Sequence, residues 1–241
     1  MILQDAEANP KLEPFASYDE LVESNSRLKI ARVAFDDTLT AAKVSDLCGS
    51  ADFIFDNVSK NPADEPFASF LSYAEAENQR GSLKTYSFVS SAGMYNPKSS
   101  DNVPMSEQTE TKESGQRLFE KEAVKRGLPL ASFRPQYIYG PLANKYDYLD
   151  WFFDRILARK PLLIPGDGSQ IVSLTNCQDV ASLVSSVCNG GDKASGIFNC
   201  GTTNVDISYN EVAVLCAAVA GVSDDELKIV NFDFDGKNKG R

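Results

Sequence analysis

The chain has 241 residues, 42% of them apolar, and carries 34 acidic against 24 basic side chains, for a formal net charge of −10. This length is enough for one full hydrophobic core. The negative charge opposes nonspecific binding of nucleic acid, whose phosphates are held mainly by Lys and Arg. The chain has no His, which excludes Ser-His-Asp and Cys-His nucleophile systems and any zinc site that uses an imidazole. An RNA site would have to be a local basic patch.

Membrane and redox signals are absent from the sequence pattern. No apolar run approaches the roughly 20 residues that a membrane-spanning helix needs. The first residues, MILQDAEANPK, hold neither a basic region nor an apolar cleavage-like segment, so we expect no transmembrane segment and no targeting peptide in this sequence. Five cysteines show no Cys-x-x-Cys spacing. We expect them to be buried thiols in a reducing compartment.

The first part of the chain predicts an arm followed by alternating strands and helices. Residues 1–28 are mostly acidic, and we expect a solvated arm there with one short helix near residues 18–23. The first convincing strand covers residues 29–35, a helix follows up to Gly49, and a second strand covers residues 52–56. The pattern of Phe67, Phe70, Leu71 and Ala74 then predicts a helix over residues 62–80.

The remaining elements follow in the same alternating order. We expect strands over residues 84–91, 130–134, 197–200 and 227–232, and helices over residues 114–126, 148–159, about 179–187 and 211–220. Ser208 and Glu211 form a capping box at the last of these helices. The pattern predicts an α/β fold with a Rossmann-like, doubly wound parallel sheet. We expect one domain over residues 29–241, with a smaller lobe over residues 142–226.

The carboxyl ends of the predicted strands hold the candidate ligand pocket, because open α/β sheets bind ligands at that edge. Arg134 precedes Pro135, which favours an extended backbone for the arginine. Its side chain either lines the cleft or pairs with a sheet carboxylate such as Asp56. Tyr137 and Tyr139 would share one face of an extended segment, and they either stack on a base or pack in the core. The full candidate set is Asp56, Asn57, Ser90, Ser91, Arg134, Gln136, Tyr137, Tyr139 and Asp179.

Each candidate also has an ordinary structural role. Asp179 sits where it can cap a helix N-terminus, which we favour over catalysis. Ser91 can bond a ligand or only the backbone beside it. The helix over residues 114–126 carries a basic ridge of Arg117, Lys121, Lys125 and Arg126, but glutamates beside it are typical of a solvated face.

Several motifs occur together in the order typical of one family. They are YSFVSSAGMY, RPQYIYGPL, WFFDRI, LIPGDGSQ, SGIFNC and LCAAVAG, and they lie between Tyr86 and Gly221 within a resemblance that covers roughly residues 29–232. This set resembles the extended and atypical short-chain dehydrogenase/reductases and, among them, the chloroplast stem-loop-binding proteins. The resemblance implies a plastid location, RNA binding and a metal-dependent endoribonuclease activity. No cluster of Asp and Glu at ligand spacing identifies a metal site, so the divalent metal is implied by the family alone.

The chain departs from the dehydrogenase-like pattern at two places. The family's first strand, glycine-rich loop and helix have no counterpart before residue 29, and those glycines hold the pyrophosphate of NAD(P). The family's Tyr-x-x-x-Lys pair aligns with Lys112 and Gln116, so the phenol that serves as general acid and base is missing. We therefore expect no catalytic residue, no cofactor-binding residue and no bound NAD(P).

Three functions remain open. The first is a non-catalytic interaction module of a plastid complex, which is associated with protein partners, with RNA, or with both. The second is a metal-dependent endoribonuclease or RNA-binding protein like the family members. The third is an NAD(P)-dependent sugar-nucleotide epimerase or dehydratase. We favour the first because the glycine loop and the Tyr-Lys pair are both missing.

Overall fold

The computed structural model describes residues 1–8, 15–96, 104–141, 148–189, 194–201 and 206–233. The chain divides into two compact units. The first consists of Met1–Gln136 and Gln178–Cys200, and the second of Tyr137–Cys177 and Gly201–Arg241. Each unit is described by itself.

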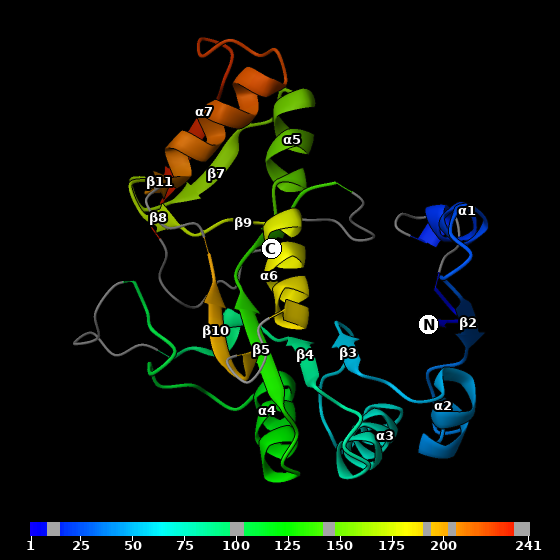
Figure 1. The fold of residues 1–241 in the computed structure, drawn as a ribbon. Coiled ribbons are helices and arrows are strands. Elements are labelled where there is room, and N and C mark those ends of the chain that lie inside the picture. Colours follow the sequence, from blue (N-terminus) through cyan, green and yellow to red (C-terminus); the bar gives the residue numbers. More distant parts are fainter. Residues whose placement is uncertain (9–14, 97–103, 142–147, 190–193, 202–205, 234–241) are drawn as a thin grey trace. The chain divides into compact units, whose positions relative to one another are not determined.

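A four-stranded parallel sheet is the centre of the first unit (Figure 1). Its order is β10 (Gly196–Cys200), β5 (Leu130–Pro135), β4 (Thr85–Val89) and β3 (Phe53–Asp56). All three pairings are parallel. This confirms the predicted Rossmann-like α/β fold, because parallel strands joined by helices form such sheets.

Helices cover both faces of this sheet. Tyr86, Phe88 and Leu130 point to one face, where they pack against α3 (Phe67–Gln79) and α4 (Gly115–Lys125). On the opposite face, Ala131 and Phe133 pack with Val184 and Val187, which lie in and just after α6 (Cys177–Ser186). Because neighbouring residues of a strand point to opposite faces, one strand contributes to both clusters.

The first 33 residues contain a strand that we did not expect from the sequence. β1 (Ile2–Asp5) pairs in parallel with β2 (Ile30–Val33), and the expected short helix between them is α1 (Tyr18–Ser24). The acidic arm is therefore a strand–helix–strand segment at its described residues. β1 has only four residues, and only Ile2 and Leu3 among them are apolar. Beside an acidic run, this pattern was too weak to predict a strand.

A second cluster joins this segment to the sheet. α2 (Ala41–Cys48) begins after Thr40, whose hydroxyl accepts a hydrogen bond from the Lys43 N–H at 3.3 Å. Its start is thus a few residues later than predicted. Leu39, Val44 and Tyr73 are the buried centre of this cluster, and side chains of β1, β2 and β3 pack around them.

The second unit is built from short strands and two helices. Its helices α5 (Asp150–Leu157) and α7 (Tyr209–Val219) pack together through Phe152, Ile156 and Val212, with Leu162 of a neighbouring strand buried beside them. A capping box joins Ser208 and Glu211 at the start of α7, as predicted. The elements of this unit are β6 (Ile138–Tyr139), α5 (Asp150–Leu157), β7 (Leu162–Pro165), β8 (Ile171–Val172), β9 (Thr175–Asn176), β11 (Ile207–Ser208), α7 (Tyr209–Val219) and β12 (Ile229–Phe232).

The boundaries of this unit differ from the lobe that we expected over residues 142–226. Residues 178–200 belong to the first unit, because β10 pairs with β5 over five residues. β10 and β5 are far apart in the sequence, and the local pattern of apolar residues does not reveal that they pair. The polar tail at residues 234–241 lies outside the described residues.

The cysteines are all free thiols, but they are not uniformly buried. Cys200 and Cys216 are buried, Cys48 and Cys177 are half-buried, and Cys188 is exposed. The expectation of buried thiols is therefore wrong for Cys188. In the described part of the chain, every helix is too short or too polar to cross a membrane.

Candidate functional site

A buried ion pair lies at the carboxyl ends of β4 and β5. Arg134 of β5 and Glu120 of α4 are each only 1% exposed. The arginine Nη2 lies 2.6 Å from Glu120 Oε2, and its Nε lies 3.0 Å from Oε1. This two-point contact is the geometry in which a guanidinium holds a carboxylate most firmly. The prediction that Arg134 pairs with Asp56 of the sheet was wrong, because the arginine pairs with Glu120 of a helix.

Three further donors surround the same carboxylate. The hydroxyls of Ser90 and Ser132 donate to Glu120 Oε1 at 2.8 Å and 2.7 Å, and Arg117 Nη1 donates to Oε2 at 3.0 Å. Burial raises the pKa of Glu120, but the hydrogen bonds from Arg134, Ser132 and Ser90 outweigh it and the pKa is lowered overall. Glu120 is thus held ionised, so it cannot serve as a general acid near neutral pH.

Arg134 continues the network on its other side. Its Nη1 donates to the Tyr95 hydroxyl at 3.0 Å, and the guanidinium lies 5.1 Å from the centre of the same ring. The Tyr95 hydroxyl donates to Asn199 Oδ1 at 2.5 Å. The pKa of Arg134 is raised, because the bonds to Glu120 and Tyr95 outweigh the effect of burial. The network ties β5, α4 and β10 together at the edge where the sequence predicted a pocket.

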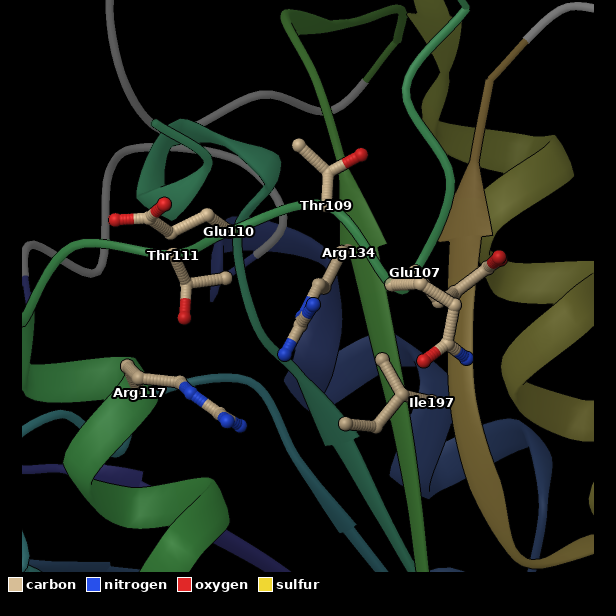
Figure 2. Close-up of a pocket in the computed structure, with 8 residues that line it drawn as sticks. Glu107, Thr109, Glu110, Thr111, Arg117, Arg134 and Ile197 are labelled. Carbon is tan, nitrogen blue, oxygen red and sulfur yellow. The ribbon is translucent and has the colours of Figure 1, made fainter. Parts of the chain in front are cut away.

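A polar cavity of about 510 Å³ opens beside this network (Figure 2). In Figure 2 the guanidinium ends of Arg117 and Arg134 point toward the same space, and the segment from Glu107 to Thr111 lies along it. The Nε of Arg117 is buried and has no hydrogen-bond partner. The lining therefore offers donors and carboxylates to a small polar ligand.

Asp56 and its neighbour Asn57 lie at the end of β3, away from the arginine contacts. Asp56 is buried and accepts from the Tyr86 hydroxyl at 2.5 Å and from the backbone N–H of Ser59 at 3.0 Å. Burial and the Asp56 carboxylate raise the pKa of Tyr86 well above its usual value. Asn57 is exposed in the turn that follows. The Asp56 carboxylate therefore orders the turn that follows β3.

Three other predicted residues of the first unit lie at the ends of helices and strands. Ser91 is half-buried and accepts from the Gly93 N–H at 3.1 Å, so it caps the short helical turn Ala92–Met94. Gln136 is half-buried directly after β5. Asp179 is exposed in the first turn of α6 rather than at its N-cap.

Tyr137 and Tyr139 belong to the second unit and do not form an extended aromatic platform. Tyr137 has a φ of 43°, a left-handed conformation that breaks the extended alternation. Its ring packs against Tyr148, with centroids 4.4 Å apart. Tyr139 is half-buried in β6. The expected shared face of the two rings was wrong, because the backbone turns at Tyr137.

Sequence reasoning missed most of the network. Glu120, Ser132, Tyr95 and Asn199 were not among the candidates. Glu120 gave a usable signal, because it lies next to Phe119 and three residues before Ala123 on the buried side of α4. Tyr95 and Asn199 are 104 positions apart, and their contact has no local signature.

The described residues hold neither a glycine turn after their first strand nor a cluster of metal ligands. The first glycine in the sequence is Gly49, so no glycine turn follows β1 to let a pyrophosphate approach the backbone. Among the described residues, no three side chains of His, Cys, Asp or Glu gather as metal ligands. We derive no chemical step through a dinucleotide or a metal ion.

Comparisons with known proteins identify the family. The model of the NAD dependent epimerase/dehydratase family matches residues 68–201. The chain is 34% identical over 165 residues to the chloroplast stem-loop binding protein of 41 kDa b from Arabidopsis thaliana, covering 65% of this chain and 42% of that protein. It is 30% identical over 112 residues to a trifunctional UDP-glucose 4,6-dehydratase, epimerase and reductase from the same plant, covering 46% of this chain and 17% of that protein.

The fold comparison agrees. The structure of Pal from Bacillus thuringiensis superposes with a TM-score of 0.67 at 22% identity, covering 98% of this chain and 78% of Pal. Our chain spans less than half the length of either curated relative. With the matched family model extending over more than half of the sequence, the chain belongs to the NAD dependent epimerase/dehydratase family and is similar, within it, to a chloroplast stem-loop binding protein.

Proposed function

We propose that this chain is a non-catalytic plastid protein that acts by docking onto a protein partner. The observation that carries this proposal is the state of the residues where the family resemblance places acid–base chemistry. Lys112 and Gln116 occupy the positions of the Tyr-x-x-x-Lys pair, and Lys112 is exposed before α4 begins. The strand ends beside it hold an ion-pair network instead of a proton donor.

The network supports a fixed structure rather than turnover. Glu120 is bound by Arg134, Arg117 and two serines, and its lowered pKa keeps it ionised. A general acid or base works best when its pKa lies near the working pH. Neither the carboxylate nor the guanidinium meets that condition, because one pKa is lowered and the other is raised.

The charges on α4 favour a protein partner over RNA. Lys121 pairs with Glu113 at 2.8 Å, Lys125 pairs with Glu122 at 3.2 Å, and Arg126 Nε pairs with Glu122 at 3.0 Å. A phosphate backbone is bound by cations that are free to replace its counterions. These lysines and this arginine already have carboxylate partners, and the chain as a whole has a net charge of −10.

The second candidate function is binding of stem-loop RNA. It is favoured by the 34% identity with a chloroplast stem-loop binding protein. The plastid location that we propose rests on the same relative. An RNA site would need cations outside the paired ridge of α4.

Catalysis is tested by restoring the missing pair. The variant Lys112→Tyr/Gln116→Lys would carry the phenol and ammonium that the family uses. We expect neither the wild-type chain nor this variant to convert UDP-glucose in the presence of NAD⁺, followed by NMR of the sugar. Turnover by the wild-type chain would refute the non-catalytic proposal.

The partner is tested by two measurements. Native purification from chloroplasts, followed by mass spectrometry of intact complexes, should recover the chain bound to a protein. Recovery only as a free monomer would contradict this. A labelled plastid stem-loop should show no mobility shift at low salt; a shift that disappears as salt is raised would establish the RNA-binding alternative.

A further inference from the structure

The polar cavity of about 510 Å³ lies on the face of the sheet that α4 covers (Figure 2). Ile197 of β10 lines it and lies opposite Ser132 in the strand register. Ser132 donates to Glu120 of α4, so both residues belong to this face. Of the described residues, neither Lys112 nor Gln116 lines the cavity. The cavity is therefore separate from the positions where the family resemblance places acid–base chemistry.

Two guanidinium groups share one carboxylate beside this cavity. Arg134 holds Glu120 through two hydrogen bonds, and Arg117 Nη1 lies 3.0 Å from Glu120 Oε2. The lowered pKa of Glu120 and the raised pKa of Arg134 keep both of these groups charged. The three side chains together therefore carry an excess of one positive charge. A charge in an enclosed site acts on its surroundings more strongly than a charge in water, so this excess favours an anion in the cavity.

Arg117 is the guanidinium that a ligand can reach. Its side chain is 26% exposed, whereas Arg134 is 1% exposed. The buried Nε of Arg117 has no partner, and among the described residues its side chain bonds only to Glu120. The protein thus satisfies this guanidinium only in part. Its end points toward the cavity in Figure 2, so its terminal nitrogens can donate to an anionic oxygen there.

The glutamates of the lining limit the charge of a ligand. Glu107 and Glu110 are both exposed. Glu107 Oε1 accepts from the Asn199 N–H at 2.8 Å, and Figure 2 shows the Glu110 carboxylate turned away from the two guanidinium groups. Neither carboxylate therefore neutralises Arg117. Their charges still repel a ligand with several negative charges, so a ligand with a single negative charge fits this balance best.

The rest of the lining is mostly polar and uncharged. It consists of Gln108, Thr109, Thr111 and the apolar Ile197. Thr109 Oγ1 accepts from the Ser106 N–H at 3.2 Å, which leaves the hydroxyl hydrogen for a ligand. The cavity volume lies within the range of roughly 300–1,000 Å³ that is typical of small-molecule sites. The space therefore suits a hydroxylated molecule rather than a single small ion.

We propose that this cavity binds a small organic acid with a single carboxylate and several hydroxyl groups. The carboxylate would accept hydrogen bonds from the terminal nitrogens of Arg117, because the planar guanidinium matches the two oxygens of a carboxylate. The hydroxyl groups would bond to Gln108, Thr109 and Thr111. This inference goes beyond the proposed function, since binding of an acid requires neither turnover nor a protein partner.

The test titrates the full 241-residue chain with three probes that share a hydroxylated carbon chain. D-Gluconate carries a single carboxylate, D-glucitol is uncharged, and D-glucitol 6-phosphate carries a phosphate with a charge of about −2 near pH 7. We expect D-gluconate to bind saturably, at least about tenfold more tightly than either of the others. It should shift the amide NMR signals of Thr109, Thr111 and Ile197.

Three results of this titration would overturn the proposal. Absence of saturable D-gluconate binding would remove the site. A preference over D-glucitol below tenfold would show that the negative charge is not recognised, and a preference over D-glucitol 6-phosphate below tenfold would show that the ligand class is not a single carboxylate. D-Gluconate that leaves the amides of Thr109, Thr111 and Ile197 unshifted would place any binding elsewhere.

Variants of α4 test the role of Arg117. Arg117→Met removes the proposed donor, and Arg117→Lys keeps the positive charge without the planar group. The matched control is Arg126→Met on the same helix, because Arg126 pairs with Glu75 and Glu122 and does not line the cavity. We expect D-gluconate affinity to fall at least about tenfold in Arg117→Met, to recover in part in Arg117→Lys, and to stay within about twofold in Arg126→Met.

Equal losses of affinity in the two methionine variants would refute the role of Arg117, because both would then act through the stability of α4. Unchanged affinity in Arg117→Met would refute it as well. Thermal unfolding shows whether each variant folds. If Arg117→Met does not fold, the amide shifts of Thr109, Thr111 and Ile197 in the wild-type chain decide the outcome.

Discussion

Arg134 shows how far local sequence reasoning reaches at the scale of one residue. The following Pro135 and the surrounding apolar strand indicated an extended, enclosed arginine, and the structure buries it. Its partner could not be read in the same way. Glu120 lies 14 positions earlier on a helix, and only the packing of α4 on the sheet brings the two together.

Removing the arginine charge should destabilise the fold strongly. Arg134→Met leaves the Glu120 carboxylate buried with fewer partners, and breaking a buried ion pair costs about 3–5 kcal/mol. We expect a loss of this size in urea unfolding followed by circular dichroism. The matched control is Lys125→Met, which removes an ion pair whose lysine is 77% exposed and should change stability by less than about 1 kcal/mol. Equal losses in the two variants would show that the buried network is not a stabilising element.

The lowered pKa of Glu120 gives a pH dependence with a defined sign. A carboxyl group with a pKa below its unfolded value of about 4.3 adds stability that is present above that pH and is lost as the pH falls through the folded pKa. The stability difference between wild type and Glu120→Gln should be constant above about pH 5.5 and should shrink on acidification below about pH 4.3. A difference that stays flat or grows at low pH would contradict the lowered pKa.

At the scale of elements, helices were predicted better than short strands. The predicted apolar stripe of α5 consists of Leu149, Phe152, Phe153, Ile156 and Leu157. The first four pack in or against the core of the second unit, but Leu157 is 63% exposed, so the prediction was wrong for that residue. β1 was missed because two apolar residues beside acidic ones resemble a solvated arm. β1 is a strand because its backbone pairs with β2, and its own four residues do not indicate this conformation.

The start of α7 offers a test at this scale. The Ser208 hydroxyl accepts from the Glu211 N–H at 3.3 Å, and the Glu211 carboxylate accepts from the Ser208 N–H at 2.7 Å. Ser208→Ala should cost about 1 kcal/mol, because one end of the helix loses its cap. Fluorescence of Trp151 during urea unfolding reports this unit, since that side chain packs against its core. Ser185→Ala, on an exposed face of α6, should leave the same transition unchanged, and an equal shift in both would argue against the cap.

At the scale of the whole molecule, the alternation of strands and helices predicted the fold class, and the parallel sheet confirms it. The loss of catalysis that the family resemblance suggested stays a prediction. The two compact units differ in their bounds from the lobe that we expected over residues 142–226, because β10 pairs with β5 over a long range in the sequence. The net charge of −10 and the paired cations of α4 both act against a phosphate-binding surface. These features agree with a protein that docks onto another protein.

The chain belongs to the NAD dependent epimerase/dehydratase family, and the central proposal is that it works without NAD(P). Calorimetric titration of the full chain with NAD⁺ tests this most directly, because binding must precede any hydride chemistry. A chain without a glycine turn for the pyrophosphate should show no saturable heat at millimolar NAD⁺. Saturable binding at micromolar NAD⁺ would contradict the claim and return the chain to the enzymes of its family.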